Sequence, residues 1–125
     1  MPRTVIAPVS IPLTAGGAYP NPLPIAAGGA DIVFTNADTV NGNAAVITNL
    51  KTFLLAFNTD TVAQTVTITS APDTLNRKGD ITAYSIAAGK VSLFGPFPTA
   101  GWNNSDGLEF TGSAATVHFA VLNTP

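Results

Sequence analysis

The feature that most constrains the fold is the short-range alternation of apolar and polar side chains across residues 52–122. Alternation with a period of two places successive side chains on opposite faces of a strand, whereas an amphipathic helix needs apolar residues three and four positions apart. Residues 64–69 (QTVTIT) show the pattern most clearly, with Val66 and Ile68 on the inward face and threonines on the other. No segment carries a helical pattern over ten or more residues. The sequence therefore predicts an all-β fold.

Turn-forming residues divide the chain beyond residue 30 into about eight candidate strands. They are residues 31–35, 44–48, 51–57, 64–69, 81–86, 90–94, 107–111 and 115–122. Short strands with turns at about 8–12-residue spacing are typical of a sandwich or barrel. We predict a single β-sandwich domain over residues 31–125. Jelly-roll and immunoglobulin-like strand orders both give this alternation, and we prefer the jelly roll.

Two local patterns add detail to this prediction. Residues 51–57 are apolar on both faces, which indicates a central strand or one whose second face is covered by a neighbour or by the N-terminal residues. The sequence Gly95-Pro96-Phe97-Pro98 is expected to turn the chain, because proline has no amide hydrogen to donate to a strand ladder.

The first thirty residues differ in composition from the rest. Residues 4–30 contain no charged side chain, and five prolines fix the backbone at close intervals. We predict an extended arm over residues 1–30 that is neither a helix nor a central strand. Its apolar side chains are more numerous than a solvated linker needs, so the arm is expected to lie on its own domain or on a neighbour. Deleting residues 1–25 is expected to leave a folded domain.

The composition offers little for catalysis. The chain has one histidine, no cysteine and 10% charged residues. No Gly-x-Ser-x-Gly elbow, phosphate-binding loop or dinucleotide fingerprint is present. His118 alternates with Val117 and Phe119, so we interpret it as a surface or interface histidine rather than a general base. We predict no enzyme activity, no catalytic residues and no cofactor.

Charge and hydropathy also limit the partners. A net charge of −2 provides no basic field for phosphates, which argues against nucleic acid. No run of about 18 uninterrupted apolar residues is present, which argues against a membrane partner, and the N-terminus does not resemble a secretory signal. Two loops carry hard oxygen ligands, namely Asn36, Asp38, Asn41 and Asn43 in one and Asn103, Asn104 and Asp106 in the other. Neither has the acidic spacing and terminal Glu of a calcium loop, so we favour turn chemistry and predict no metal site.

The order of several motifs resembles that of small β-sandwich proteins from tailed bacteriophages, the capsid decoration (cement or head auxiliary) proteins. The matching segments are KTFLLAFNTD at 51–60, QTVTI at 64–68, IAAG at 86–89, FGPFP at 94–98 and NSDGLEF at 104–110. The resemblance covers about residues 44–122 and leaves the predicted arm unmatched.

This resemblance implies a structural virion protein that binds the outer surface of the bacteriophage head and stabilises the shell by bridging capsomers. The implied partners are the major capsid protein and further copies of this chain in a homotrimer. The implied location is the capsid exterior, after assembly in the host cytoplasm. The family has no catalytic residues to carry over. Alternative functions are a tail or fibre component, or a carbohydrate-binding β-sandwich module.

Eight residues are candidates for partner contact. They are Val5, Ile6, Val9, Ile11, Tyr19, Arg77, Lys78 and Trp102. The first four are apolar residues of the predicted arm. Arg77 and Lys78 are the only adjacent cationic pair, either in a solvated turn or facing an acidic capsid surface. Tyr19 and Trp102 are loop aromatics, for which core filling and contact with a partner or sugar are both open.

Overall fold

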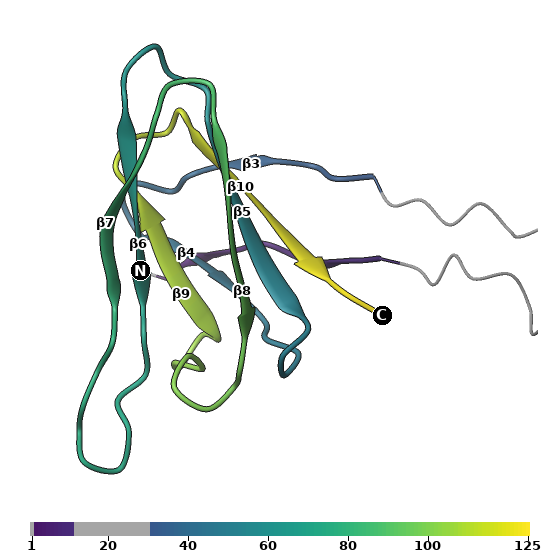
Figure 1. The fold of residues 1–125 in the computed structure, drawn as a ribbon, viewed down its shortest axis with the longest axis vertical. Coiled ribbons are helices and arrows are strands. Elements are labelled where there is room, and N and C mark those ends of the chain that lie inside the picture. The colour runs from purple at the N-terminus through teal and green to yellow at the C-terminus, as the bar shows by residue number, and fades with distance from the viewer. Residues whose placement is uncertain (1, 12–30) are drawn as a thin grey trace, which may run out of the picture.

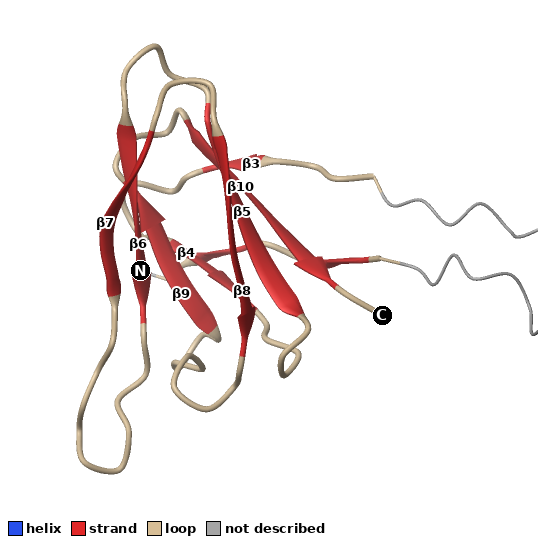
Figure 2. Cartoon of the chain, viewed as in Figure 1, coloured by secondary structure: helices blue, strands red, loops and turns tan. Residues whose placement is uncertain are grey.

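A computed structural model of the chain describes residues 2–11 and 31–125. In these residues all regular structure is β, and two mixed sheets pack face to face (Figures 1 and 2). The strands are β1 (Thr4–Val5), β2 (Val9–Ser10), β3 (Thr35–Asn36), β4 (Asn43–Ala45), β5 (Thr52–Asn58), β6 (Gln64–Thr69), β7 (Ile81–Ile86), β8 (Val91–Phe97), β9 (Leu108–Gly112) and β10 (Val117–Asn123). The predicted all-β sandwich is confirmed, and the preference for a jelly-roll order stays a prediction.

One sheet has the order β1-β4-β9-β6-β7, and the other has the order β2-β10-β5-β8. Strand β10 pairs with β5 along its whole length in antiparallel register. Its other edge is shared by two short strands: β3 pairs with its first half, and β2 runs parallel to its last two residues. Strand β3 has only two residues, fewer than the predicted strand over 31–35.

The core lies between the sheets and is built from alternate residues of the long strands. Its fully buried members include Leu54 and Ala56 of β5, Val66 and Ile68 of β6, Leu108 and Phe110 of β9, and Val117 and Phe119 of β10. The rings of Phe110 and Phe119 meet edge to face, with centroids 4.7 Å apart, and so join the two sheets. Burying each large apolar side chain contributes about 1.5–3 kcal/mol, so these inward positions hold the sheets together.

Residues 2–11 belong to the sandwich and do not form a separate arm. Strand β1 pairs with β4 in one sheet and β2 pairs with β10 in the other, both in parallel register. Between them, Ile6 donates its amide hydrogen to the Ala44 carbonyl at 2.8 Å, and its side chain is only 6% exposed within the core. Pro8 lies between the two strands, where no ladder donor is required. Residues 12–30 of the predicted arm lie outside the described residues.

Strand β8 continues through the sequence that was expected to turn the chain. Phe94 is paired with Leu54 and Phe97 with Thr52, so Gly95 and Pro96 form a bulge in the ladder. The predicted turn at this position is wrong because β8 is an edge strand, where a missing proline donor leaves no ladder bond unmade. Gly95 has φ 121°, and a Cβ there would lie 2.8 Å from the Thr52 carbonyl oxygen. The bulge therefore requires glycine at this position.

Candidate interaction surfaces

The outer face of the β2-β10-β5-β8 sheet is apolar across three strands. Its members, which we call the apolar face, are Phe53, Leu55 and Phe57 of β5, Val91 and Leu93 of β8, and Ala120 and Leu122 of β10. Leu55 lies between Leu93 on one side and Ala120 on the other, so the apolar side chains run continuously across the strands. Leu93 is 59% exposed. A face of this composition is typical of a surface that meets another protein.

The outer face of the other sheet is polar. Thr67 of β6 lies opposite Thr111 of β9, and Thr69 lies opposite Glu109. The Glu109 carboxylate pairs with the Arg3 guanidinium at 3.3 Å, which fastens the N-terminal residues to this sheet. Water-facing sides of antiparallel sheets usually have this composition. The sandwich is thus one-sided, with a polar outer face on one sheet and an apolar outer face on the other.

Part of the apolar face is covered by the chain itself. The Phe34 ring, just before β3, packs edge to face on Phe57 with centroids 5.7 Å apart. Val91 and Leu93 stay exposed at the β8 side of the sheet. Phe57 is therefore covered by a residue of the sandwich itself and not by a neighbour or by the predicted arm, and the β8 side of the face remains exposed.

His118 lies on the same outer face, between Phe57 of β5 and Asn36 of β3, and is half-buried. This placement agrees with a surface or interface histidine.

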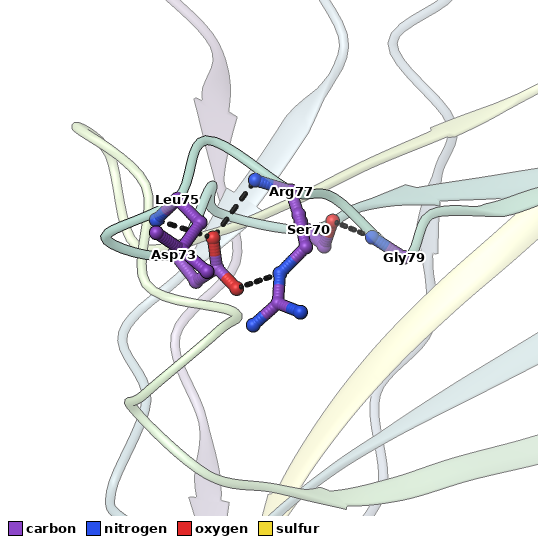
Figure 3. A network of polar contacts seen from close by, with 5 residues as sticks. All are labelled: Ser70, Asp73, Leu75, Arg77 and Gly79. Atoms are coloured by element: carbon purple, nitrogen blue, oxygen red, sulfur yellow. Dashed lines mark hydrogen bonds and ion pairs between the residues drawn. The ribbon is translucent and has the colours of Figure 1, made fainter.

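A second surface is the loop between β6 and β7, residues 70–80, which extends beyond the end of the sandwich (Figure 1). We call it the Asp73 loop. Asp73 Oδ1 accepts hydrogen bonds from the amides of Leu75 and Arg77, both at 2.8 Å, and Oδ2 accepts one from Arg77 Nε at 2.7 Å (Figure 3). The Arg77 amide, followed by its side chain, lowers the pKa of Asp73. One carboxylate thus fixes the tip of the loop.

The base of the Asp73 loop is held by a second carboxylate. Asp80 Oδ1 accepts hydrogen bonds from the Ser70 amide at 2.7 Å and from the Ser70 hydroxyl at 2.8 Å. The Gly79 amide in turn donates to Ser70 Oγ at 2.7 Å (Figure 3). The Ser70 amide is the main cause of the lowered pKa of Asp80, and Lys78 adds an ion pair at 3.9 Å. The loop is therefore closed at both its base and its tip.

The residues predicted to contact a partner do not gather on one surface. Val5 is 61% exposed, Val9 and Ile11 are half-buried beside β10, Arg77 and Lys78 lie in the Asp73 loop, and Tyr19 lies outside the described residues. Ile6 is in the core, so its side chain is not available to a partner. Trp102 is half-buried against Phe97, with ring centroids 5.2 Å apart, which favours core filling at this position.

Leu75 and Leu93 are two of the exposed apolar residues that sequence reasoning did not single out. Leu93 had a usable signal, because it alternates with the inward Phe94 in a strand whose outward positions are also apolar. Leu75 had none, because an isolated apolar residue in a polar loop has no periodicity.

The first Asn-rich and Asp-rich loop has a structural role. Asp38 accepts hydrogen bonds from the amides of Val40 and Asn41, and from the Thr4 hydroxyl at 2.6 Å. The Asn41 amide and then Thr4 lower the pKa of Asp38 to about 2. The carboxylate therefore shapes the turn and fastens β1 to it, in agreement with turn chemistry.

Metal, ligand and membrane sites are the remaining possibilities within residues 2–11 and 31–125. In these two stretches, no group of three or more His, Cys, Asp or Glu side chains is placed to hold a metal, and no pocket is formed. The same part of the chain has no helix that could cross a membrane. Comparison with family models, curated proteins and solved structures finds no match to the chain.

Proposed function

We propose that the chain is a structural virion protein of the decoration type, which binds the outside of a bacteriophage head and stabilises the shell by bridging capsomers. The observation that carries the proposal is the one-sided sandwich. Exposing an uncharged face with Val91 and Leu93 to water is unfavourable for a monomer. In an assembly, a neighbouring subunit covers such a face. The motif order within residues 44–122 adds the resemblance to decoration proteins.

In the proposed assembly, the apolar face meets further copies of the chain in a homotrimer. Interfaces between copies are depleted in charged residues at their centre, and the apolar face contains none. The polar face of the other sheet, with Thr67 and Glu109, would stay in water on the capsid exterior. The major capsid protein is the second proposed partner.

The stabilising effect would follow from mass action. A protein that binds only the assembled shell lowers its free energy by an amount that grows with the protein's concentration relative to the dissociation constant. Three linked copies bind more tightly than one, because the second and third contacts form at high effective concentration. A small domain without a catalytic site can therefore protect a large particle.

The carbohydrate-binding alternative receives less support. Such a module would use exposed loop aromatics, and Trp102 is packed against Phe97. Tyr84 of β7 is partly exposed, and its ring packs edge to face on Phe94. A tail or fibre component would have the same sandwich fold but would be present in fewer copies per particle than a decoration protein.

The test is the copy number of this chain relative to the major capsid protein in purified particles, measured by quantitative mass spectrometry. A ratio near one supports decoration of the whole shell. A few copies per particle would instead assign the chain to the tail or to a vertex, and its absence from particles would refute a virion role. Light scattering of the purified chain tests the trimer, which a monomeric mass would contradict.

A further inference from the structure

The edges of the two sheets differ in how well they could pair with another strand. Within the described residues, the first sheet ends at β1 and β7, and the second ends at β8 on one side and at β2 and β3 on the other. Strands β1, β2 and β3 have two residues each, and the ladder of β7 is irregular, with Ala83 at φ 51°. Short or irregular edges resist pairing with other chains. The longest regular edge that remains is β8.

The first half of β8 has backbone groups that its own sheet does not use. Asn58 donates its amide hydrogen to the Lys90 carbonyl at 3.0 Å, and the register with β5 stays regular up to the bulge. Hydrogen-bonded residues alternate along an antiparallel ladder, so the backbone groups of Ser92 point towards β5. The amides and carbonyls of Val91 and Leu93 therefore point away from the sheet, in the direction where a further strand would lie.

The same two residues also carry exposed apolar side chains. Val91 is 50% exposed and Leu93 is 59% exposed, both on the apolar face. Natural edge strands usually prevent pairing with charged side chains, proline or a bulge. Strand β8 contains no charged residue, and its proline and bulge lie beyond the regular part. The segment from Val91 to Phe94 therefore combines free backbone groups with apolar side chains.

This segment is complementary to itself. When two copies are related by a two-fold axis through Ser92, Val91 of each copy lies opposite Leu93 of the other, and each such pair exchanges two backbone hydrogen bonds. The aliphatic side chains of each pair then lie side by side, and the apolar face continues from one copy into the next. Lys90 of each copy lies opposite Phe94 of the other, so the two lysines are at opposite ends of the contact.

We propose that the first half of β8 pairs with the same segment of a second copy, in an antiparallel contact centred on Ser92. The contact uses the edge of the sheet and not its face, so it goes beyond the proposed trimer and can join copies that belong to different trimers. It is much smaller than a standard protein interface, so it is weak between free chains. It strengthens where copies are held close together, because their effective concentration is then high.

The experiment is disulfide crosslinking of the full chain, which has no cysteine of its own. In the proposed pairing, residue 92 of each copy faces residue 92 of the other with Cα atoms about 4.5 Å apart, a distance that a disulfide can span. Under mild oxidation, Ser92→Cys should form linked dimers about tenfold faster than the matched control Ser85→Cys on the β7 edge. Ser92 is half-buried and Ser85 is exposed, so random collisions would favour the control.

A second variant tests whether backbone pairing makes the contact. Val91→Pro removes an amide that points away from β5, so the ladder within the copy keeps its hydrogen bonds. In the Ser92→Cys background, it should slow crosslinking about tenfold, whereas Val91→Ile, which keeps the amide, should stay within about twofold. The urea midpoint of each reduced variant shows whether it is folded. If Val91→Pro is unfolded, the comparison of Ser92→Cys with Ser85→Cys still decides.

The outcomes separate this inference from the proposed function. Equal or slower crosslinking of Ser92→Cys relative to Ser85→Cys would overturn the inference, as would crosslinking that a folded Val91→Pro variant leaves unchanged. A trimeric mass without preferential crosslinking would refute the β8 contact and leave the trimer standing. Preferential crosslinking of a chain that forms no trimer would support the β8 contact and refute the trimer.

Discussion

Replacing Ile6 with alanine tests whether the N-terminal stretch, residues 2–11, contributes to the core. The Ile6 side chain is 6% exposed, whereas its neighbour Val5 is 61% exposed and serves as the matched control. Truncating a buried isoleucine costs about 2–5 kcal/mol, and we expect about 2–3 kcal/mol here because the adjoining two-residue strand can move partly into the cavity. Val5→Ala should cost no more than about 0.5 kcal/mol.

The assay is equilibrium unfolding in urea, followed by the fluorescence of Trp102, the only tryptophan, which is half-buried beside Phe97. With an m-value of about 2 kcal/mol/M, Ile6→Ala should lower the midpoint by about 1–1.5 M at unchanged m, and Val5→Ala by about 0.25 M or less. Equal small shifts for the two variants would refute the assignment of Ile6 to the core. Deletion of residues 1–25 is now expected to destabilise the domain, contrary to the expectation from sequence.

Three further predictions concern acid stability, backbone strain and assembly. The pKa of Asp38 is lowered to about 2, so its stabilising contribution is complete above about pH 4 and is lost as the pH falls from about 4 towards 2. In Asp38→Asn, the urea midpoint of unfolding should therefore depend less on pH between about 4 and 2 than it does in the wild type. An unchanged pH profile would contradict this prediction. Gly107→Ala should destabilise the domain by about 1–3 kcal/mol or more, because φ is 100° and the new Cβ would collide with a backbone carbonyl. Gly89→Ala should cost only about 1 kcal/mol in the same unfolding assay, because φ is 72° but no atom lies near the new Cβ. Leu93→Glu should convert the proposed trimer to smaller species by light scattering, and an intact trimer would show that the apolar face is not the contact between copies.

Local alternation was sufficient to predict the long strands. The predicted strands 64–69 and 81–86 coincide with β6 and β7, and Val66 and Ile68 point into the core as expected. Strand β6 forms antiparallel ladders with β9 on one side and with β7 on the other, and successive side chains of such strands point to opposite faces of the sheet.

The N-terminal strands could not be predicted in the same way. Strands β1 and β2 have two residues each and no alternation that can be measured over such a length. Their existence depends on open edges of β4 and β10, which are about forty and more than one hundred residues away in the chain. Proline-rich composition correctly argued against a central strand, and edge pairing is compatible with it. The long-range pairing, which sequence patterns do not report, decides the structure here.

For the candidate surfaces too, the sequence predicts features that depend on neighbouring residues but not those that depend on the folded conformation. The contrast between residues 64–69, apolar on one face, and residues 51–57, apolar on both, is readable from sequence and explains the one-sided sandwich. Sequence could not show that Arg77 pairs with Asp73, because the spacing of four residues is the same in any loop conformation.

The apolar face would contribute affinity to the proposed trimer more than it fixes the orientation of the copies. Burial of an apolar face such as that around Leu93 is non-directional, so it supplies affinity between copies but tolerates small changes in their orientation. Loss of the apolar face should therefore lower the oligomeric state of the proposed trimer while each copy stays folded.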